Sequence, residues 1–153
     1  MEALTEAEAL EFLASADVAH LAVVDANGPY VTPQAFVVDG RQVLFRSGPG
    51  RRLDAIRRHP EVSLEACYLD HRTGDWLSVI ASGPARVTSD QYSALEAVGL
   101  LTNKYRRLLD VPLAMSGLQP LMDMSFVVQV VIQEISGVCS NRRAITSALR
   151  ERR

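Results

Sequence analysis

Short apolar segments separated by tight turns restrict the fold of this chain more than any other feature of its sequence. The turn signals Asp25-Ala26-Asn27-Gly28 and Asp39-Gly40 stand between consecutive segments, as in β-hairpins. Strands joined so closely pair antiparallel, and such a sheet avoids exposed edges by closing on itself. The six predicted strands are Val18 to Val24, Pro29 to Val38, Arg41 to Arg46, Glu61 to Leu69, Trp76 to Thr88 (interrupted at Gly83-Pro84) and Phe126 to Ile135.

Helices are predicted between and outside these strands, so the class is β-rich α+β. Thr5 and Glu8 have the spacing of a capping box and open a helix that ends near residue 16. Ser89-Asp90 offers an N-cap for a helix that reaches Leu109. The remaining predictions are a helix from Arg51 to Arg58, an irregular loop over 110–123 and a basic helical tail over 142–153.

The length and composition are those of one globular domain that spans residues 1–153. A net charge of −2 argues against a nucleic-acid partner, which requires a broad basic face. The chain has no apolar run long enough to span a bilayer, and its acidic start is unlike a signal peptide. With two distant cysteines, Cys67 and Cys139, a cytoplasmic protein with reduced thiols is favoured, and a single disulfide stays open as an alternative.

The last predicted strand is apolar on both faces, since Gln129 and Gln133 are its only polar interruptions before Glu134. A second subunit that packs on the barrel would cover one face of such a strand. Helices of the same chain would cover it equally well. The sequence leaves both alternatives open.

The bend between the third strand and the next helix, Phe45 to Ile56, combines a Gly-Pro-Gly elbow with Arg51 and Arg52 at the helix start. Two arginines at a helix N-terminus oppose the helix dipole, at a cost of roughly a few tenths of a kcal/mol each. An anion at the elbow would reverse this balance, because free amides and two guanidinium groups would meet there. The bend therefore predicts a phosphate site, and the alternative is a solvent-exposed helix start.

No familiar catalytic arrangement accompanies this bend. His20, His59 and His71 lack metal-ligand spacing, so no metal site is predicted. The motifs GxSxG, GxGxxG and the P-loop do not occur in the chain. Catalytic residues therefore stay unassigned, which is consistent with a cofactor that carries the chemistry itself.

Five segments follow one another in an order and spacing that carry a family resemblance: His20 to Val24, Pro29 to Gln34, Gly50 to Val62, Trp76 to Val79 and Gly83 to Val87. With them, the chain resembles the pyridoxamine 5'-phosphate oxidase-like family and, within it, the nitroimidazole-resistance-type flavin or deazaflavin reductases. The resemblance covers about residues 1 to 110 and implies a six-stranded antiparallel split β-barrel with peripheral helices that binds FMN.

The resemblance also implies site residues. It assigns the FMN phosphate to Arg52, with Arg51 and Ser47 as helpers and with Arg46 and Gly50 at the same bend. It places the flavin ring between two protomers and so implies a homodimer. The residues that would meet the ring are Thr32, Pro33, Gln34 and Ala35 of the second strand and Trp76, Ser78 and Val79 of the fifth.

The function implied is an FMN-dependent oxidoreductase that passes electrons between a donor, such as a reduced nicotinamide, and a small organic substrate. One alternative is a deazaflavin-dependent reductase, in which the basic bend would hold a longer anionic tail. Another is a flavin or haem carrier without catalytic activity. The oxidase reaction on pyridoxamine phosphate is less favoured, because Ser140 to Arg143 only faintly resembles the C-terminal signature that holds that substrate.

Overall fold

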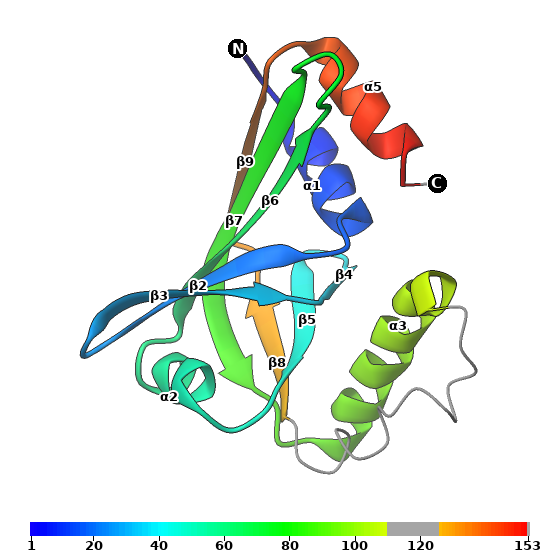
Figure 1. Ribbon diagram of the computed structural model, residues 1–153. Helices are drawn as coiled ribbons and strands as arrows, with labels where there is room; N and C mark the ends of the chain where they lie inside the picture. The colour runs from blue at the N-terminus through cyan, green and yellow to red at the C-terminus, as the bar shows by residue number, and fades with distance from the viewer. Residues whose placement is uncertain (110–125, 153) are drawn as a thin grey trace.

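The computed structural model describes residues 1–109 and 126–152, which contain nine strands and four helices (Figure 1). The strands are β1 (Glu2–Ala3), β2 (Ala19–Asp25), β3 (Gly28–Gln34), β4 (Val37–Asp39), β5 (Gln42–Ser47), β6 (Glu61–Leu69), β7 (Trp76–Val87), β8 (Phe126–Val131) and β9 (Glu134–Cys139). The helices are α1 (Glu6–Ser15), α2 (Arg51–Arg58), α3 (Gln91–Leu109) and α5 (Arg142–Arg150). The β-rich α+β class predicted above is confirmed.

Every described strand pairing is antiparallel. The main path of paired strands is β3-β2-β6-β7-β8-β5-β4, and β9 pairs with β7 and β1 beside it. Within the described residues no pairing joins β3 to β4, the two ends of this path. Closure of the sheet into a barrel therefore stays a prediction.

The prediction of six strands is wrong, because two of the predicted strands are each divided and β1 was not foreseen. The segment Pro29 to Val38 breaks after Gln34, where the backbone N–H of Phe36 donates to the Tyr105 hydroxyl, 2.8 Å away, instead of to a neighbouring strand. The segment Phe126 to Ile135 breaks after Val131 and continues as β9. At this second break the Ile132 amide donates to the Arg41 carbonyl, 2.8 Å away. Both breaks therefore involve hydrogen bonds to distant parts of the chain.

The predicted interruption at Gly83-Pro84 is also wrong, because β7 runs through it from Trp76 to Val87. What changes at this point is the partner of β7, which is β9 before Gly83 and β8 after it. A Cβ atom on Gly83 would stand 1.8 Å from the Val131 carbonyl oxygen. Glycine is needed here because the backbone that leaves β8 passes very close to that of β7.

The predicted helices are present. The capping box of Thr5 and Glu8 opens α1, with the Thr5 hydroxyl accepting from the Glu8 amide. The helix that was predicted to reach Leu109 does so as α3, with the Asp90 carboxylate accepting from the Ser93 amide near its start. The last helix, α5, is shorter than predicted and ends at Arg150. The loop predicted over 110–123 lies outside the described residues.

The sequence left open whether a second subunit or a helix of the same chain covers the last predicted strand. In the structure, a helix of the same chain covers part of it. Val127 of β8 packs with Leu44 and Ala97, and the latter belongs to α3. The opposite face of β8 is buried in the main core, where Val128 and Val130 lie. Cys67 and Cys139 are free thiols, and among the described residues no helix is long and apolar enough to cross a bilayer.

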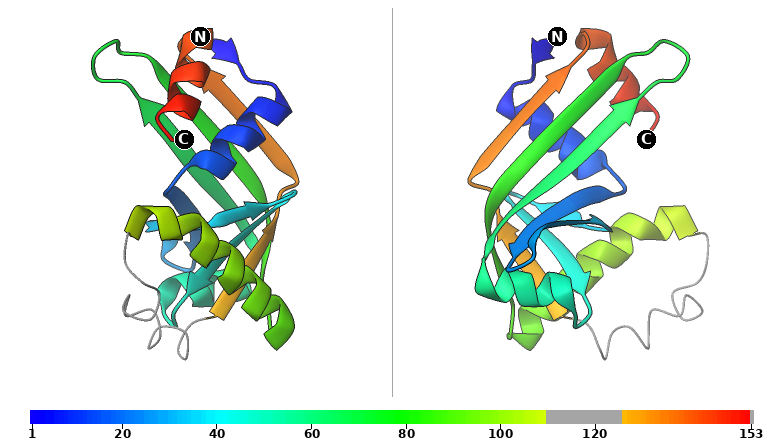
Figure 2. Two further views of the ribbon diagram at one scale, coloured as in Figure 1. Left: turned by 90° about the vertical axis from the view of Figure 1, so that its right-hand side faces the viewer. Right: turned by 60° about the vertical axis from the view of Figure 1, so that its left-hand side comes forward.

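Helices α1 and α5 cover one face of the sheet formed by β6, β7 and β9, and no described helix covers its other face (Figure 2, right). The exposed side chains along β2, β3, β6 and β7 include four large aliphatic residues. Each of them exposes about half of its surface: Val24, Val31, Leu69 and Ile80. The same face also carries the His20–Glu65 pair and the Ser63–Ser82 pair, and Glu65 stands directly opposite Ile80, so the outward face is mixed.

Candidate functional site

Arg52 is held at the beginning of α2 by two neighbouring strands. Its Nε donates to the Ser47 hydroxyl, 3.2 Å away, at the end of β5. Its Nη1 donates to the Thr32 hydroxyl of β3, also at 3.2 Å. Burial lowers the pKa of the Arg52 guanidinium, and the described residues hold no carboxylate that neutralises it by an ion pair. The guanidinium is therefore a fixed positive charge that an anion can still reach.

The backbone next to Arg52 is open to a ligand. Gly50 is the N-cap of α2, has φ +144°, and provides no side-chain hydrogen bond to the first helical turn. No described atom lies within 4 Å of the position where a Cβ would stand on Gly48 or Gly50. The first amides of a helix have no partner inside the helix, so they point toward this open space. Free amides and a fixed cation together form an anion site.

Gln34 connects this site to the bend after β3. Its side-chain Nε2 donates to the Ala35 carbonyl at 2.8 Å and to the Arg46 carbonyl at 3.2 Å. Gln34 is 7% exposed, and its Oε1 has no hydrogen-bond partner among the described residues. Burial also lowers the pKa of Arg46, which precedes Ser47 on β5. Of the predicted strand residues, Pro33 points to the opposite, exposed side of β3.

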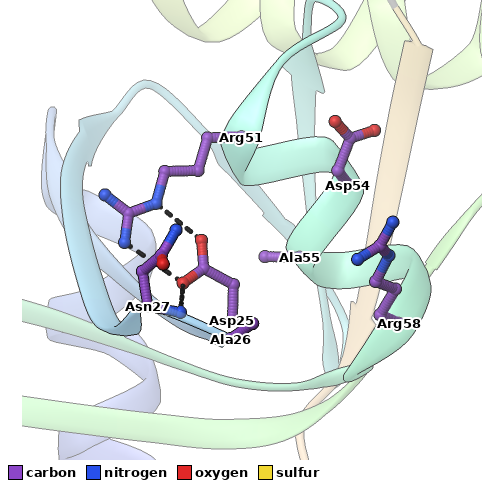
Figure 3. Close-up of a pocket in the computed structure, with 7 residues that line it drawn as sticks. All are labelled: Asp25, Ala26, Asn27, Arg51, Asp54, Ala55 and Arg58. Atoms are coloured by element: carbon purple, nitrogen blue, oxygen red, sulfur yellow. Dashed lines mark hydrogen bonds and ion pairs between the residues drawn. The ribbon is translucent and has the colours of Figure 1, made fainter.

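Arg51 lies away from Arg52. Its Nε donates to Asp25 Oδ2 at 2.6 Å and its Nη2 to Asp25 Oδ1 at 3.2 Å (Figure 3). Its guanidinium carbon also lies 4.2 Å from the centre of the Tyr30 ring. This hydrogen-bonded ion pair lowers the pKa of Asp25 and raises that of Arg51. The Arg51 side chain is therefore bound to the β2–β3 turn, and its implied role as a helper of Arg52 in holding the phosphate stays a prediction.

A cavity of about 380 Å³ lies between the β2–β3 turn and the outer side of α2. Arg51 and Asp25 form one wall, and Asp54 and Arg58 of α2 form another (Figure 3). Arg51 is thus both the first residue of α2 and part of this cavity, whereas Arg52, Thr32 and Ser47 do not line it.

The predicted residues of the fifth strand lie elsewhere. Trp76, Ser78 and Val79 belong to the first half of β7, at the end of the sheet opposite α2 (Figure 1). The Ser78 hydroxyl donates to Glu65 at 3.1 Å, and the Trp76 amide donates to the Ser140 hydroxyl at 3.0 Å. The Val79 side chain is fully buried in the core, so it does not face a surface site. Within one chain these residues do not join Arg52.

Sequence reasoning missed Asp25, Lys104 and Tyr105. Lys104 Nζ donates to the Ala16 and Phe36 carbonyls at 2.7 and 2.9 Å, and the Tyr105 hydroxyl binds the Phe36 amide. These contacts fix the bend that follows Gln34. Asp25 belongs to the turn that was predicted between the first two strands, but no local sequence signal indicated its ion pair with Arg51 of α2.

The arrangement can bind an anion, but the described residues add neither a metal site nor an activated nucleophile to it. Among residues 1–109 and 126–152, no group of three metal-ligating side chains exists. No nucleophile in the anion site is bonded to a general base, because the Ser47 hydroxyl donates to the Gly48 carbonyl and accepts from Arg52. The site is therefore suited to hold a phosphate-bearing ligand.

Comparisons with known proteins agree with this description. A family model described as pyridoxamine 5'-phosphate oxidase matches residues 5–139. An uncharacterized protein from Rhizobium meliloti is 33% identical over 72 residues, which are 46% of this chain and 46% of that protein, so the match spans about half of the length of this curated relative.

Solved structures share the fold. A FAD-binding protein from Mesorhizobium loti superposes with a TM-score of 0.72 at 20% identity, over 92% of this chain and 98% of the other. A candidate 5-nitroimidazole antibiotic resistance protein from Bacteroides thetaiotaomicron gives 0.68 at 18% identity, over 89% and 86% of the two chains.

Proposed function

Since the chain belongs to the pyridoxamine 5'-phosphate oxidase family, we propose that it is a flavin-dependent oxidoreductase that acts on a small organic substrate. The proposed cofactor is an FMN unit whose phosphate binds at the beginning of α2. A flavin supplies the hydride and electron chemistry, which leaves the protein to bind and orient it. The FAD-binding neighbour from Mesorhizobium loti supports a flavin in this fold.

The observation that carries the proposal is the position of Arg52. Its guanidinium is oriented by Thr32 and Ser47 and lies next to the open, uncapped start of α2. A cation at a helix start is unfavourable unless an anion accompanies it. The phosphate of a flavin nucleotide would accept from Arg52 and from the free amides, and Gln34 would lie nearby to bond a more distant part of the cofactor.

We propose further that the active form is a homodimer. The sheet face that no described helix covers exposes the aliphatic side chains of Val24, Val31, Leu69 and Ile80, and burying them against a second subunit would favour association. Trp76 and Ser78 lie on the half of β7 remote from Arg52, so a partner chain is needed if both groups are to meet one flavin ring. Sedimentation velocity tests this proposal, because Ile80→Lys should shift a dimer toward the monomer.

Flavin titration tests the phosphate site. We expect Arg52→Ala to weaken FMN binding about 10- to 100-fold, since a charged hydrogen bond contributes roughly 1.5–3 kcal/mol. Arg57→Ala is the matched control. Arg57 lies on the same helix as Arg52, but its guanidinium carbon lies over the Phe126 ring, 5.0 Å from the centre of that ring. Unchanged FMN affinity in Arg52→Ala would reject the assignment.

Turnover tests the enzymatic part of the proposal. The protein loaded with flavin is expected to oxidise a reduced nicotinamide in the presence of a small organic acceptor. The decrease in absorbance of the reduced nicotinamide measures this reaction. A protein that binds flavin but never exchanges electrons with either partner would be a carrier.

A further inference from the structure

The bend between β3 and β4 brings α3 into contact with the strand that carries Thr32. Phe36 is fully buried in this bend, between Gln34 at the end of β3 and Val37 at the start of β4, so neither strand pairing includes its backbone. Buried backbone groups need hydrogen-bond partners, and those of Phe36 find them on α3 instead of on a neighbouring strand. This part of α3 therefore determines where the bend lies.

Tyr105 and Lys104 of α3 supply these partners. The Phe36 amide donates to the Tyr105 hydroxyl at 2.8 Å, and the same hydroxyl lies 2.7 Å from the Asp17 carbonyl oxygen and 3.0 Å from that of Phe36. Lys104 Nζ donates to the Phe36 carbonyl at 2.9 Å and lies 4.0 Å from the centre of the Phe36 ring. Both backbone groups of Phe36 are thus held by α3.

Gln34 joins this bend to the anion site. Its Nε2 donates to the Ala35 carbonyl at 2.8 Å and to the Arg46 carbonyl at 3.2 Å, so one amide group bridges the bend and β5. Arg46 directly precedes Ser47, whose hydroxyl accepts from Arg52 Nε at 3.2 Å. An unbroken series of hydrogen bonds and chain neighbours therefore runs from α3 to the guanidinium of the anion site.

We propose that Tyr105 is a positioning residue of the flavin site, an inference that rests on the proposed function. By fixing the Phe36 amide, its hydroxyl keeps the bend in place. The Gln34 bridge then holds the end of β5, and with it Ser47, where Arg52 can meet a phosphate. A binding group has to stay within about 0.5 Å of its productive position, and hydrogen bonds behind it provide this precision.

Titrations of Tyr105→Phe with FMN and riboflavin test the inference, because the two ligands differ only in the phosphate. We expect FMN binding to weaken about 3- to 10-fold and riboflavin binding to stay within about 1.5-fold, so that the ratio of the two affinities falls. Tyr92→Phe is the matched control and should change neither affinity, since it removes the same hydroxyl from α3 at a residue that is 78% exposed. Thermal melting of each variant shows that it is folded at the temperature of the titration.

A double-mutant cycle with Gln34→Met tests whether Tyr105 acts through Gln34. Methionine keeps the length of the side chain but cannot donate to the two carbonyls. In this background Tyr105→Phe should change FMN affinity by less than about 1.5-fold, because the bridge that it positions is already lost. If the two losses multiply instead, Tyr105 does not act through Gln34 and the inference is refuted.

The remaining outcomes separate this inference from the proposed function. If Arg52→Ala weakens FMN binding but Tyr105→Phe does not, or if Tyr105→Phe weakens FMN and riboflavin binding equally, the flavin site stands and the positioning role of Tyr105 is refuted. If the native protein binds neither FMN nor riboflavin, the proposed function fails, and this inference fails with it.

Discussion

The Nη1 atom of Arg52 lies 3.2 Å from the Thr32 hydroxyl, so a helix residue and a strand residue twenty positions apart form one anion site. Thr32→Val keeps the shape of the side chain but removes this acceptor. We expect it to weaken FMN binding about 3- to 10-fold, as the loss of one hydrogen bond predicts. Fluorescence titration measures the effect, and riboflavin, which has no phosphate, is the control ligand. An equal loss for riboflavin would show that Thr32 supports the ring and not the phosphate.

The Arg51–Asp25 ion pair predicts a pH dependence of stability. The pKa of Asp25 is lowered in the folded state by the hydrogen bonds from Arg51, so its stabilising effect is present above the ordinary aspartate pKa of about 4. The effect is lost as the pH falls below that value and Asp25 becomes protonated. We expect the difference in free energy of unfolding between the native protein and Asp25→Asn to shrink in this acidic range. Chemical denaturation at a series of pH values measures it, and a constant difference would contradict the prediction.

The elements that depend on neighbouring residues could be predicted from the sequence. The capping box of Thr5 and Glu8, the hairpin at Asp39-Gly40 and the helix that stops before Pro60 are confirmed, because their signals lie within a few residues of the structure they determine. The basic bend at the start of α2 was predicted on the same basis, whereas the pairing of Arg52 with Ser47 was implied by the family resemblance. Local sequence therefore pointed to this bend, and its role as a binding site stays a prediction.

Features that depend on distant residues escaped prediction. The break after Gln34 exists because Tyr105, 69 positions beyond Phe36, binds the Phe36 amide. Arg51 turns away from the predicted phosphate because its partner, Asp25, lies 26 positions earlier. Neither contact has a local signal, since side-chain pairing across the fold follows from topology and not from spacing.

The close approach of the Val131 backbone to Gly83 of β7 should leave no room for a side chain there. A Cβ atom there would stand 1.8 Å from the Val131 carbonyl oxygen, which belongs to the backbone and cannot rotate away. We expect Gly83→Ala to lower the free energy of unfolding by about 1–3 kcal/mol, as overpacking does. Gly48→Ala is the matched control and should change it by less than about 0.5 kcal/mol, because no described atom lies within 4 Å of its Cβ position. Similar melting temperatures for the two variants would contradict this close backbone approach.

Lys104 should make the protein more stable as the pH rises above about 8. Burial lowers its pKa from 10.5 to about 8, against an opposing influence from Asp17 and with a smaller contribution from Arg152. Below pH 8 the side chain is charged in both states, and the folded state bears the full cost of burying that charge. Between about 8 and 10.5 the folded state loses the proton first, so the unfolded state binds more protons and stability increases with pH. Denaturation of the native protein and of Lys104→Met isolates this contribution, since their difference should rise in favour of the native protein across this range. A difference that stays level or falls would show that Lys104 keeps an ordinary pKa despite its position between Ala16 and Phe36.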